Sequence, residues 1–123
     1  MAEHTDFGKK AELLAEDFLR KKGYEILARN FVFQKGEIDI IARLGNCVII
    51  VEVKARATDA FLEPHEAVNR KKIRLLVMAA DEFLNRFNHR EEVRFDIISV
   101  IQPRDRPPVI THIENAFESF DAN

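Results

Sequence analysis

The sequence predicts an α/β protein in which helices flank a mixed β-sheet. The 123-residue chain is 46% hydrophobic and contains ten phenylalanines, which is enough for one domain with its own core. Two segments show helical periodicity, and several short apolar runs between and after them have the length of strands. We therefore expect a single domain over residues 1–123 with an αβββαβ core.

The first helix is expected from about Thr5 or Asp6 to Lys22. Apolar residues recur there at helical spacing, and a basic triplet followed by Gly23 marks the end. Tyr24 to Ala28 alternates weakly and predicts a strand. The segment 29–36 fits no single pattern.

Two apolar strands are expected next, over Glu37–Arg43 and Cys47–Lys54. Gly45-Asn46 between them suits a two-residue hairpin turn, because such turns need positive φ angles. A loop is expected over 55–63, and Pro64 is expected to open a short helical turn.

The clearest helix is expected from an N-cap at Asn69 to about Asn88, since an apolar stripe runs along it. A strand over Val93–Ile101 follows. After a proline-rich turn, Val109–Glu114 is expected to add an edge strand.

Composition excludes several classes of protein. No apolar run has the roughly 20 residues of a membrane span, and the N-terminus lacks a signal-peptide core. One cysteine excludes an internal disulfide, so we expect a cytoplasmic protein. The net charge of −2 argues against a nucleic-acid binder. However, residues 1–90 carry 16 basic and 14 acidic side chains, whereas residues 91–123 carry 3 and 7, so the main body is mildly basic.

Three charged residues of the hairpin point to a metal site. With a two-residue turn, Asp39 lies opposite Glu52, and like charges at that distance repel. Lys54 follows on the same face as Glu52. A cation such as Mg²⁺ would relieve the repulsion, and the lysine would serve the attacking water. Alternatively, Asp39 is an ordinary polar residue at a strand end. A bulge or a longer turn would also shift Asp39 and Glu52 out of register by one residue.

Glu12 is a further candidate acid. On the first helix it borders the apolar stripe, so a helix packed on the sheet would aim it at the same cation. Spacing alone equally allows a solvated helical glutamate.

The chain resembles the YraN family of uncharacterised bacterial proteins, which is similar to archaeal Holliday junction resolvases of the PD-(D/E)XK restriction-endonuclease-like superfamily. The resemblance covers nearly the whole chain. Its main motifs are Gly8-x-x-x-Glu12, Arg29-Asn30, Gly36-Glu37-Ile38-Asp39-Ile40-Ile41-Ala42, Val51-Glu52-Val53-Lys54-x-Arg56, and Arg94-Phe95-Asp96. Ile38 stands where the superfamily motif has proline.

The resemblance implies a restriction-endonuclease-like fold and an endonuclease that uses Mg²⁺ or Mn²⁺. It implies a centre at Asp39, Glu52 and Lys54, with Glu12 as the helical acid and the carbonyl of Val53 as an added metal ligand. The expected substrate is DNA, including branched or structured DNA, and a homodimer would suit paired cuts in a junction. Because such an assignment rests on analogy, a non-catalytic nucleic-acid-binding module and an adaptor in DNA uptake or repair stay as alternatives.

Basic side chains near this centre are candidates for phosphate contacts. Arg70, Lys71 and Lys72 begin the second helix, and Arg56 ends the hairpin strand. Contacts of this kind position a nucleic-acid backbone without reading its sequence. A solvated helix face would look the same for any one of them.

Overall fold

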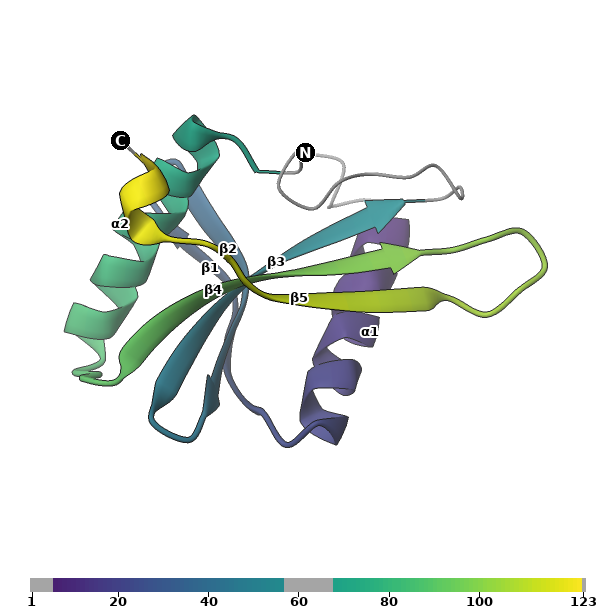
Figure 1. Cartoon of the computed structure of the whole chain (residues 1–123), viewed down its shortest axis with the longest axis horizontal. Coiled ribbons are helices and arrows are strands. Elements are labelled where there is room, and N and C mark those ends of the chain that lie inside the picture. The colour runs from purple at the N-terminus through teal and green to yellow at the C-terminus, as the bar shows by residue number, and fades with distance from the viewer. Residues whose placement is uncertain (1–5, 57–67, 123) are drawn as a thin grey trace.

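The computed structural model describes residues 6–56 and 68–122 and forms a five-stranded sheet with one long helix on each face (Figure 1). The elements are α1 (Asp6–Lys21), β1 (Glu25–Phe33), β2 (Gly36–Leu44), β3 (Cys47–Arg56), α2 (Arg70–Arg86), β4 (Glu92–Ile101), β5 (Val109–Phe117) and the short η3 (Ser119–Ala122). The predicted αβββαβ order is confirmed, with β5 added at one edge.

The sheet is mixed, and its strand order is β1-β2-β3-β4-β5. Neighbours are antiparallel except β3 and β4, which pair in parallel over their whole length. A parallel pair needs a long crossover connection, and α2 lies within that connection. Strands β3 and β4 therefore have a helix on each face of the sheet, which accounts for the apolar residues on both of their faces.

The core has two layers, one on each face of the sheet. Residues on the α2 side include Ile41, Ile50, Leu76 and Ile97, and those on the α1 side include Ala15, Leu19, Ile40, Ile49 and Ile98. Successive strand residues alternate between these layers, as the pleat of a strand requires. The apolar stripes of both helices are thus buried against opposite faces of one sheet.

The two edge strands extend furthest beyond their predicted ends. β1 continues to Phe33 through the segment that fits no pattern, and β5 continues to Phe117. Each of these edge strands contains an asparagine with positive φ, Asn30 at 51° and Asn115 at 53°. These irregular positions disturb the two-residue alternation on which strand prediction depends. The expected loop over 55–63 starts too early, because β3 continues through Ala55 and Arg56; the rest of that loop and the expected turn at Pro64 lie outside the described residues.

A buried carboxylate, Asp96, joins β4 to β5. Arg94 donates to both of its oxygens at 2.9 and 2.8 Å, His112 Nε2 lies 2.7 Å from Oδ2, and the N–H of Asn115 donates to Oδ1. Lys22 Nζ lies 2.8 Å from the other His112 nitrogen. Because a lysine ammonium only donates, His112 accepts at Nδ1 and donates from Nε2 to Asp96.

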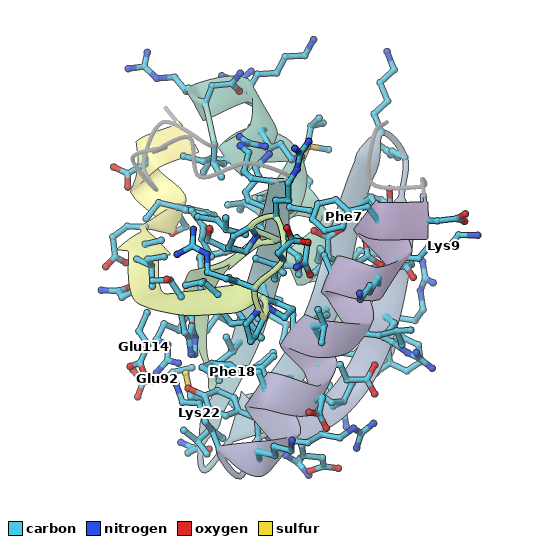
Figure 2. All side chains as sticks on the ribbon, turned by 90° about the vertical axis from the view of Figure 1, so that its right-hand side faces the viewer. Phe7, Lys9, Phe18, Lys22, Glu92 and Glu114 are labelled. Carbon is cyan, nitrogen blue, oxygen red and sulfur yellow. The ribbon has the colours of Figure 1, made fainter. Side chains whose placement is uncertain are left out.

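The same network reaches the end of α1. Arg94 also donates to the Tyr24 hydroxyl at 2.8 Å, and Lys22 lies over the Phe18 ring. Figure 2 shows Phe18, Lys22 and Glu114 near one end of α1, and Phe7 and Lys9 at its other end. The Asp96 network therefore fixes the last turn of α1 against the sheet.

Across the two described ranges, no helix is long and apolar enough to span a membrane. The expected cytoplasmic location stays a prediction.

Candidate metal centre

Asp39 lies where strands β2 and β3 stop pairing. Their pairs run from Leu44↔Cys47 to Ile40↔Val51, which confirms the predicted two-residue turn and register. Asp39 is one residue beyond the last pair, and its Oδ2 accepts a 2.8 Å hydrogen bond from the N–H of Val53. This side-chain contact corrects the expected direct strand pairing of Asp39 with Glu52, because the regular ladder ends one residue earlier.

A local break in β2 accompanies this contact. Ile38 packs on the α2 side of the sheet and Ile40 on the α1 side, although residues two apart in a regular strand share a face. On the adjacent strand β1, the left-handed Asn30 lies between the partners of Ile38 and Ile40. The irregularity at Asp39 in β2 therefore lies beside the irregularity at Asn30 in β1.

Asp39 and Glu52 are both buried, with only 6% and 4% of their surfaces exposed. The pKa of Asp39 is raised to about 8, mainly by burial and further by the negative charges of Glu52 and Glu12. The Val53 hydrogen bond and the positive charge of Lys72 lower the pKa, but by less. The site therefore places more negative charge in a buried space than the protein itself compensates.

Two lysines from different elements contact Glu52. Lys72 Nζ lies 2.7 Å from Glu52 Oε2, and Lys54 Nζ lies 3.6 Å from the same oxygen. Asn69 is the N-cap of α2, as predicted, and its side chain accepts from the N–H of Lys72 at 2.8 Å. The cap thereby fixes the first turn of α2, from which Lys72 extends to Glu52.

Glu12 is held beside the centre by β1. Asn30 Nδ2 donates to Glu12 Oε1 at 3.1 Å, and one helical turn later Glu16 pairs with Arg29 at 3.3 Å. The negative charge of Glu12 acts on Asp39. Adjacent residues of β1 thus hold two glutamates of α1 and orient that face of the helix toward the site.

The two acids also line a cleft of 280 Å³ between the β1–β2 turn and the start of α2. Gly36 begins β2 at this point, and its backbone packs against α2. A Cβ on Gly36 would come within 2.5 Å of the carbonyl oxygen of Leu75. Glycine is therefore required for the close approach that brings α2, and with it Lys72, over Glu52.

The donor chemistry of the site suits a hard cation. Mg²⁺ is commonly held by one or two carboxylates together with water and substrate phosphates. Within residues 6–56 and 68–122, no three His, Cys, Asp or Glu side chains converge closely enough to form a metal site alone. Two carboxylates completed by non-side-chain oxygens would fit this arrangement. The roles of the Val53 carbonyl and of Glu12 stay predictions.

The predicted phosphate-contacting residues are divided between two places. Arg70 and Lys71 are exposed at the start of α2, and Lys72 from the same turn reaches Glu52. Arg56 is half-buried at the end of β3, where it donates to the carbonyl of Ala55 at 3.2 Å. Three of the four residues thus begin the helix that borders the cleft.

Sequence reasoning missed two structural roles. Lys72 was expected to meet phosphate, yet it pairs with Glu52; no local pattern links a helix start to a strand 20 residues earlier. Asn30 belongs to one of the motifs named above, but the sequence assigns it no role. Its only signal was an asparagine, a residue that tolerates positive φ, within a phenylalanine-rich segment.

Comparison with known sequences places these residues in a family. Residues 11–100 match the profile described as "Uncharacterised protein family UPF0102". This range includes Glu12, Asp39, Glu52, Lys54 and Lys72 but ends before β5.

Similar full-length relatives occur in several bacteria. "UPF0102 protein FP2501" of Flavobacterium psychrophilum is 48% identical over 120 residues, which is 98% of this chain and 100% of the relative. A UPF0102 protein of Christiangramia forsetii is 46% identical with the same coverage. "UPF0102 protein THEYE_A1950" of Thermodesulfovibrio yellowstonii is 43% identical over 91% of this chain and 96% of its own. None of these names states an activity.

Proposed function

The chain belongs to the uncharacterised protein family UPF0102, and we propose that this member is a metal-dependent nuclease that hydrolyses DNA phosphodiester bonds. The expected cation is Mg²⁺ or Mn²⁺. The proposal agrees with the resemblance to the PD-(D/E)XK superfamily, but it rests on the site itself.

One observation carries the proposal: two carboxylates are buried together without enough positive charge around them. Asp39 and Glu52 are each more than nine-tenths buried, and burial together with the charge of Glu52 keeps the pKa of Asp39 near 8. Burying like charges costs free energy that folding does not recover unless a ligand compensates them. Groups with strongly shifted pKa values cluster at functional sites. A divalent cation is the ligand that fits two carboxylates.

The residues of the chain then take distinct roles. Asp39 and Glu52 would hold the cation, with the Val53 carbonyl as a further donor and Glu12 contributing negative charge. Such a cation neutralises phosphate charge and lowers the pKa of bound water. Lys54, next to Glu52, would orient the water or the phosphate. Lys72 neutralises Glu52 in the metal-free protein and would turn toward substrate phosphate once a cation takes its place.

The exposed cations at the start of α2 support DNA as the substrate. Arg70 and Lys71 would contact phosphates that flank the cleft, and the N-terminus of α2 favours anions at the same place. Arg56 would add a contact at the end of β3. These contacts carry no sequence information, so we expect recognition of DNA structure rather than of base sequence.

A direct test compares linear, flap and junction DNA in Mg²⁺ and in Mn²⁺. Wild type is expected to cut at least one of them, whereas Asp39→Asn and Lys54→Ala are expected not to. Asp17→Asn is a matched control, because Asp17 is an exposed acid on α1 that pairs with Lys21 at the surface. Equal cleavage by wild type, Asp39→Asn and Lys54→Ala would refute the assigned site.

The Lys72–Glu52 ion pair favours a second candidate, a DNA-binding module that does not cleave. At 2.7 Å, this lysine already compensates one of the two acids without a cation. Such a module would bind DNA equally well with and without metal, with affinity that falls steeply as salt rises. Metal-independent binding together with intact DNA after incubation in Mn²⁺ would select this alternative.

A further inference from the structure

The cleft beside Asp39 and Glu52 has features of a ligand site that the metal chemistry does not require. Its volume is 280 Å³. One wall is the β1–β2 turn with Val32 and Gln34, the other is the start of α2 with Leu75, and the two acids lie along it. A pair of metal-binding carboxylates needs no such apolar cleft next to it.

We propose that this cleft binds the base of one unpaired nucleotide next to the scissile phosphate. The inference rests on the proposed function and names its substrate class: DNA with an unpaired nucleotide at the point of cleavage, rather than a continuous duplex.

Size is the first argument. The cleft of 280 Å³ lies just below the range of about 300–1,000 Å³ that is typical of pockets for small organic ligands, so it suits a ligand no larger than a single base and is too small for a base pair with its two backbones. Because Asp39 and Glu52 are almost completely buried, a phosphate must come close to this cleft to reach them. A stacked base reaches a concave site only when it leaves the duplex, and an unpaired base does so at lower cost.

The chemistry of the walls is the second argument. Val32 is 58% exposed on an edge strand, and Leu75 on the opposite wall is half-buried. These two aliphatic side chains, which both line the cleft, offer apolar surface to a planar base. Gln34 supplies an amide that both donates and accepts, as the polar edge of a base requires. Lys72, at the acid end of the cleft, is placed for the attached phosphate.

Rigidity is the third argument. Gln34 has a φ of 55°, the positive value that the two-residue turn between β1 and β2 requires. Gly36 packs the same turn against the Leu75 carbonyl. Both walls are thus fixed before a ligand arrives, which lowers the entropic cost of binding.

Binding can be measured without cleavage by replacing Mg²⁺ with Ca²⁺. The probes are two DNA duplexes that differ in one feature: the fluorescent base 2-aminopurine is paired with thymine in one and is an unpaired bulge in the other. Wild type is expected to bind the bulged duplex at least 10-fold more tightly and to change its fluorescence. Equal affinity for the two duplexes would overturn the inference.

Variants that fill the cleft locate the effect. Val32→Trp and Leu75→Trp are expected to reduce the preference for the bulge to less than 2-fold, and Gln34→Ala is expected to weaken it without changing the size of the walls. Met78→Trp is the control, since Met78 is 40% exposed on the same helix and does not line the cleft. The chain has no tryptophan, so each of the three tryptophan variants also carries a single fluorescent reporter of its own fold. An unchanged preference in folded Val32→Trp and Leu75→Trp would contradict the proposal.

Cleavage of the same two duplexes in Mn²⁺ separates the two proposals. If both duplexes are cut at equal rates, hydrolysis stands and the base-binding cleft is refuted. If neither is cut but the bulge preference and its loss in Val32→Trp remain, the cleft stands and hydrolysis is refuted.

Discussion

Two buried aspartates of the same sheet have opposite surroundings. Asp96 on β4 receives hydrogen bonds from Arg94, His112 and the N–H of Asn115. Burial raises the pKa of Asp96, but these three partners outweigh burial and leave it below its ordinary value of 3.8. Asp39 on β2 has the Val53 N–H as its hydrogen-bond donor and faces Glu52, so its pKa is raised to about 8.

The difference separates a structural carboxylate from a functional one. Asp96 stays ionised because the fold compensates its charge, and it joins β4, β5 and the end of α1. Asp39 lies in surroundings that oppose its ionisation, and carboxyl groups whose pKa is strongly shifted in this way concentrate at functional sites. Burial alone would not distinguish the two, since both side chains are almost completely enclosed.

The largest expected effect is on activity. Asp39→Asn removes a proposed metal ligand and should lower the rate of DNA cleavage by about 10³-fold or more. It also removes a repelled charge, so at pH 9 the metal-free variant should be at least as stable as wild type. Rates measured on a labelled substrate and urea unfolding check both parts. A variant that loses stability and keeps activity would make Asp39 a structural residue rather than a functional one.

The next effect is on stability at the other aspartate. Asp96→Asn leaves Arg94 without its buried partner, and breaking such a pair costs about 3–5 kcal/mol. Urea unfolding near pH 7 measures the loss. Asp17→Asn serves again as the exposed control and should change stability by about 0.5 kcal/mol or less. An Asp96→Asn protein as stable as wild type would mean that the network does not hold β4 and β5 together.

The two aspartates should give opposite responses to pH. Between pH 4 and 8 the folded metal-free protein keeps a proton on Asp39 that the unfolded chain has released. Its free energy of unfolding should therefore fall as pH rises through this window, by up to about 1.4 kcal/mol per pH unit. The pKa of Asp96 is lowered, so its contribution is present above pH 4 and is lost as pH falls below that value.

Added Mn²⁺ provides the control for the pH experiment. A cation that keeps Asp39 ionised should remove the Asp39 slope and leave the acid-side loss from Asp96 unchanged. Urea unfolding from pH 3 to 9, with and without Mn²⁺, measures both. If Mn²⁺ leaves the slope between pH 4 and 8 unaltered, Asp39 is not a ligand.

A smaller effect is expected at Asn30, which positions Glu12. Asn30→Gly keeps the positive φ and deletes the donor, and loss of a supporting hydrogen bond of this kind lowers metal affinity about 10-fold or more. Asn30→Ala should show the same loss of affinity and an added destabilisation of about 1–2 kcal/mol from the strained backbone. Mn²⁺ titration calorimetry and urea unfolding separate the two. Wild-type affinity in Asn30→Gly would remove Glu12 from the site.

The smallest effect is expected at the exposed cations. Arg70→Ala should weaken DNA binding by about tenfold or less at low salt, equally for all sequences. It should also reduce the slope of log affinity against log salt by about 1. Fluorescence anisotropy at several salt concentrations measures this, with Arg86→Ala at the far end of α2 as control. An unchanged slope would place Arg70 outside the interface.

Local patterns predicted most of the fold. The turn at Gly45-Asn46 set the β2–β3 register correctly, and Asn69 capped α2 where expected. Both are signals contained in a few adjacent residues. The full length of β1 could not be predicted, because Asn30 interrupts its alternation and one edge of the strand is unpaired.

The candidate site was predictable only as far as one hairpin reaches. Asp39, Glu52 and Lys54 share that hairpin, so its register brings them near one another. The contacts of Glu52 with Lys72, and of Glu12 with Asn30, depend on how two helices pack on the sheet. Packing across long sequence separations leaves no periodic trace in a single sequence, and the break at Asp39 needs the same three-dimensional information.

The end of the β2–β3 ladder at Ile40 and Val51 has a kinetic consequence. The hairpin begins at a tight turn whose residues are adjacent in sequence, so that end can pair early during folding. The acids lie at the opposite end, where closure also needs the first turn of α2 and brings like charges together. A cation bound there would stabilise contacts that form after the folding transition state. We therefore expect Mn²⁺ to slow unfolding while leaving the refolding rate nearly unchanged.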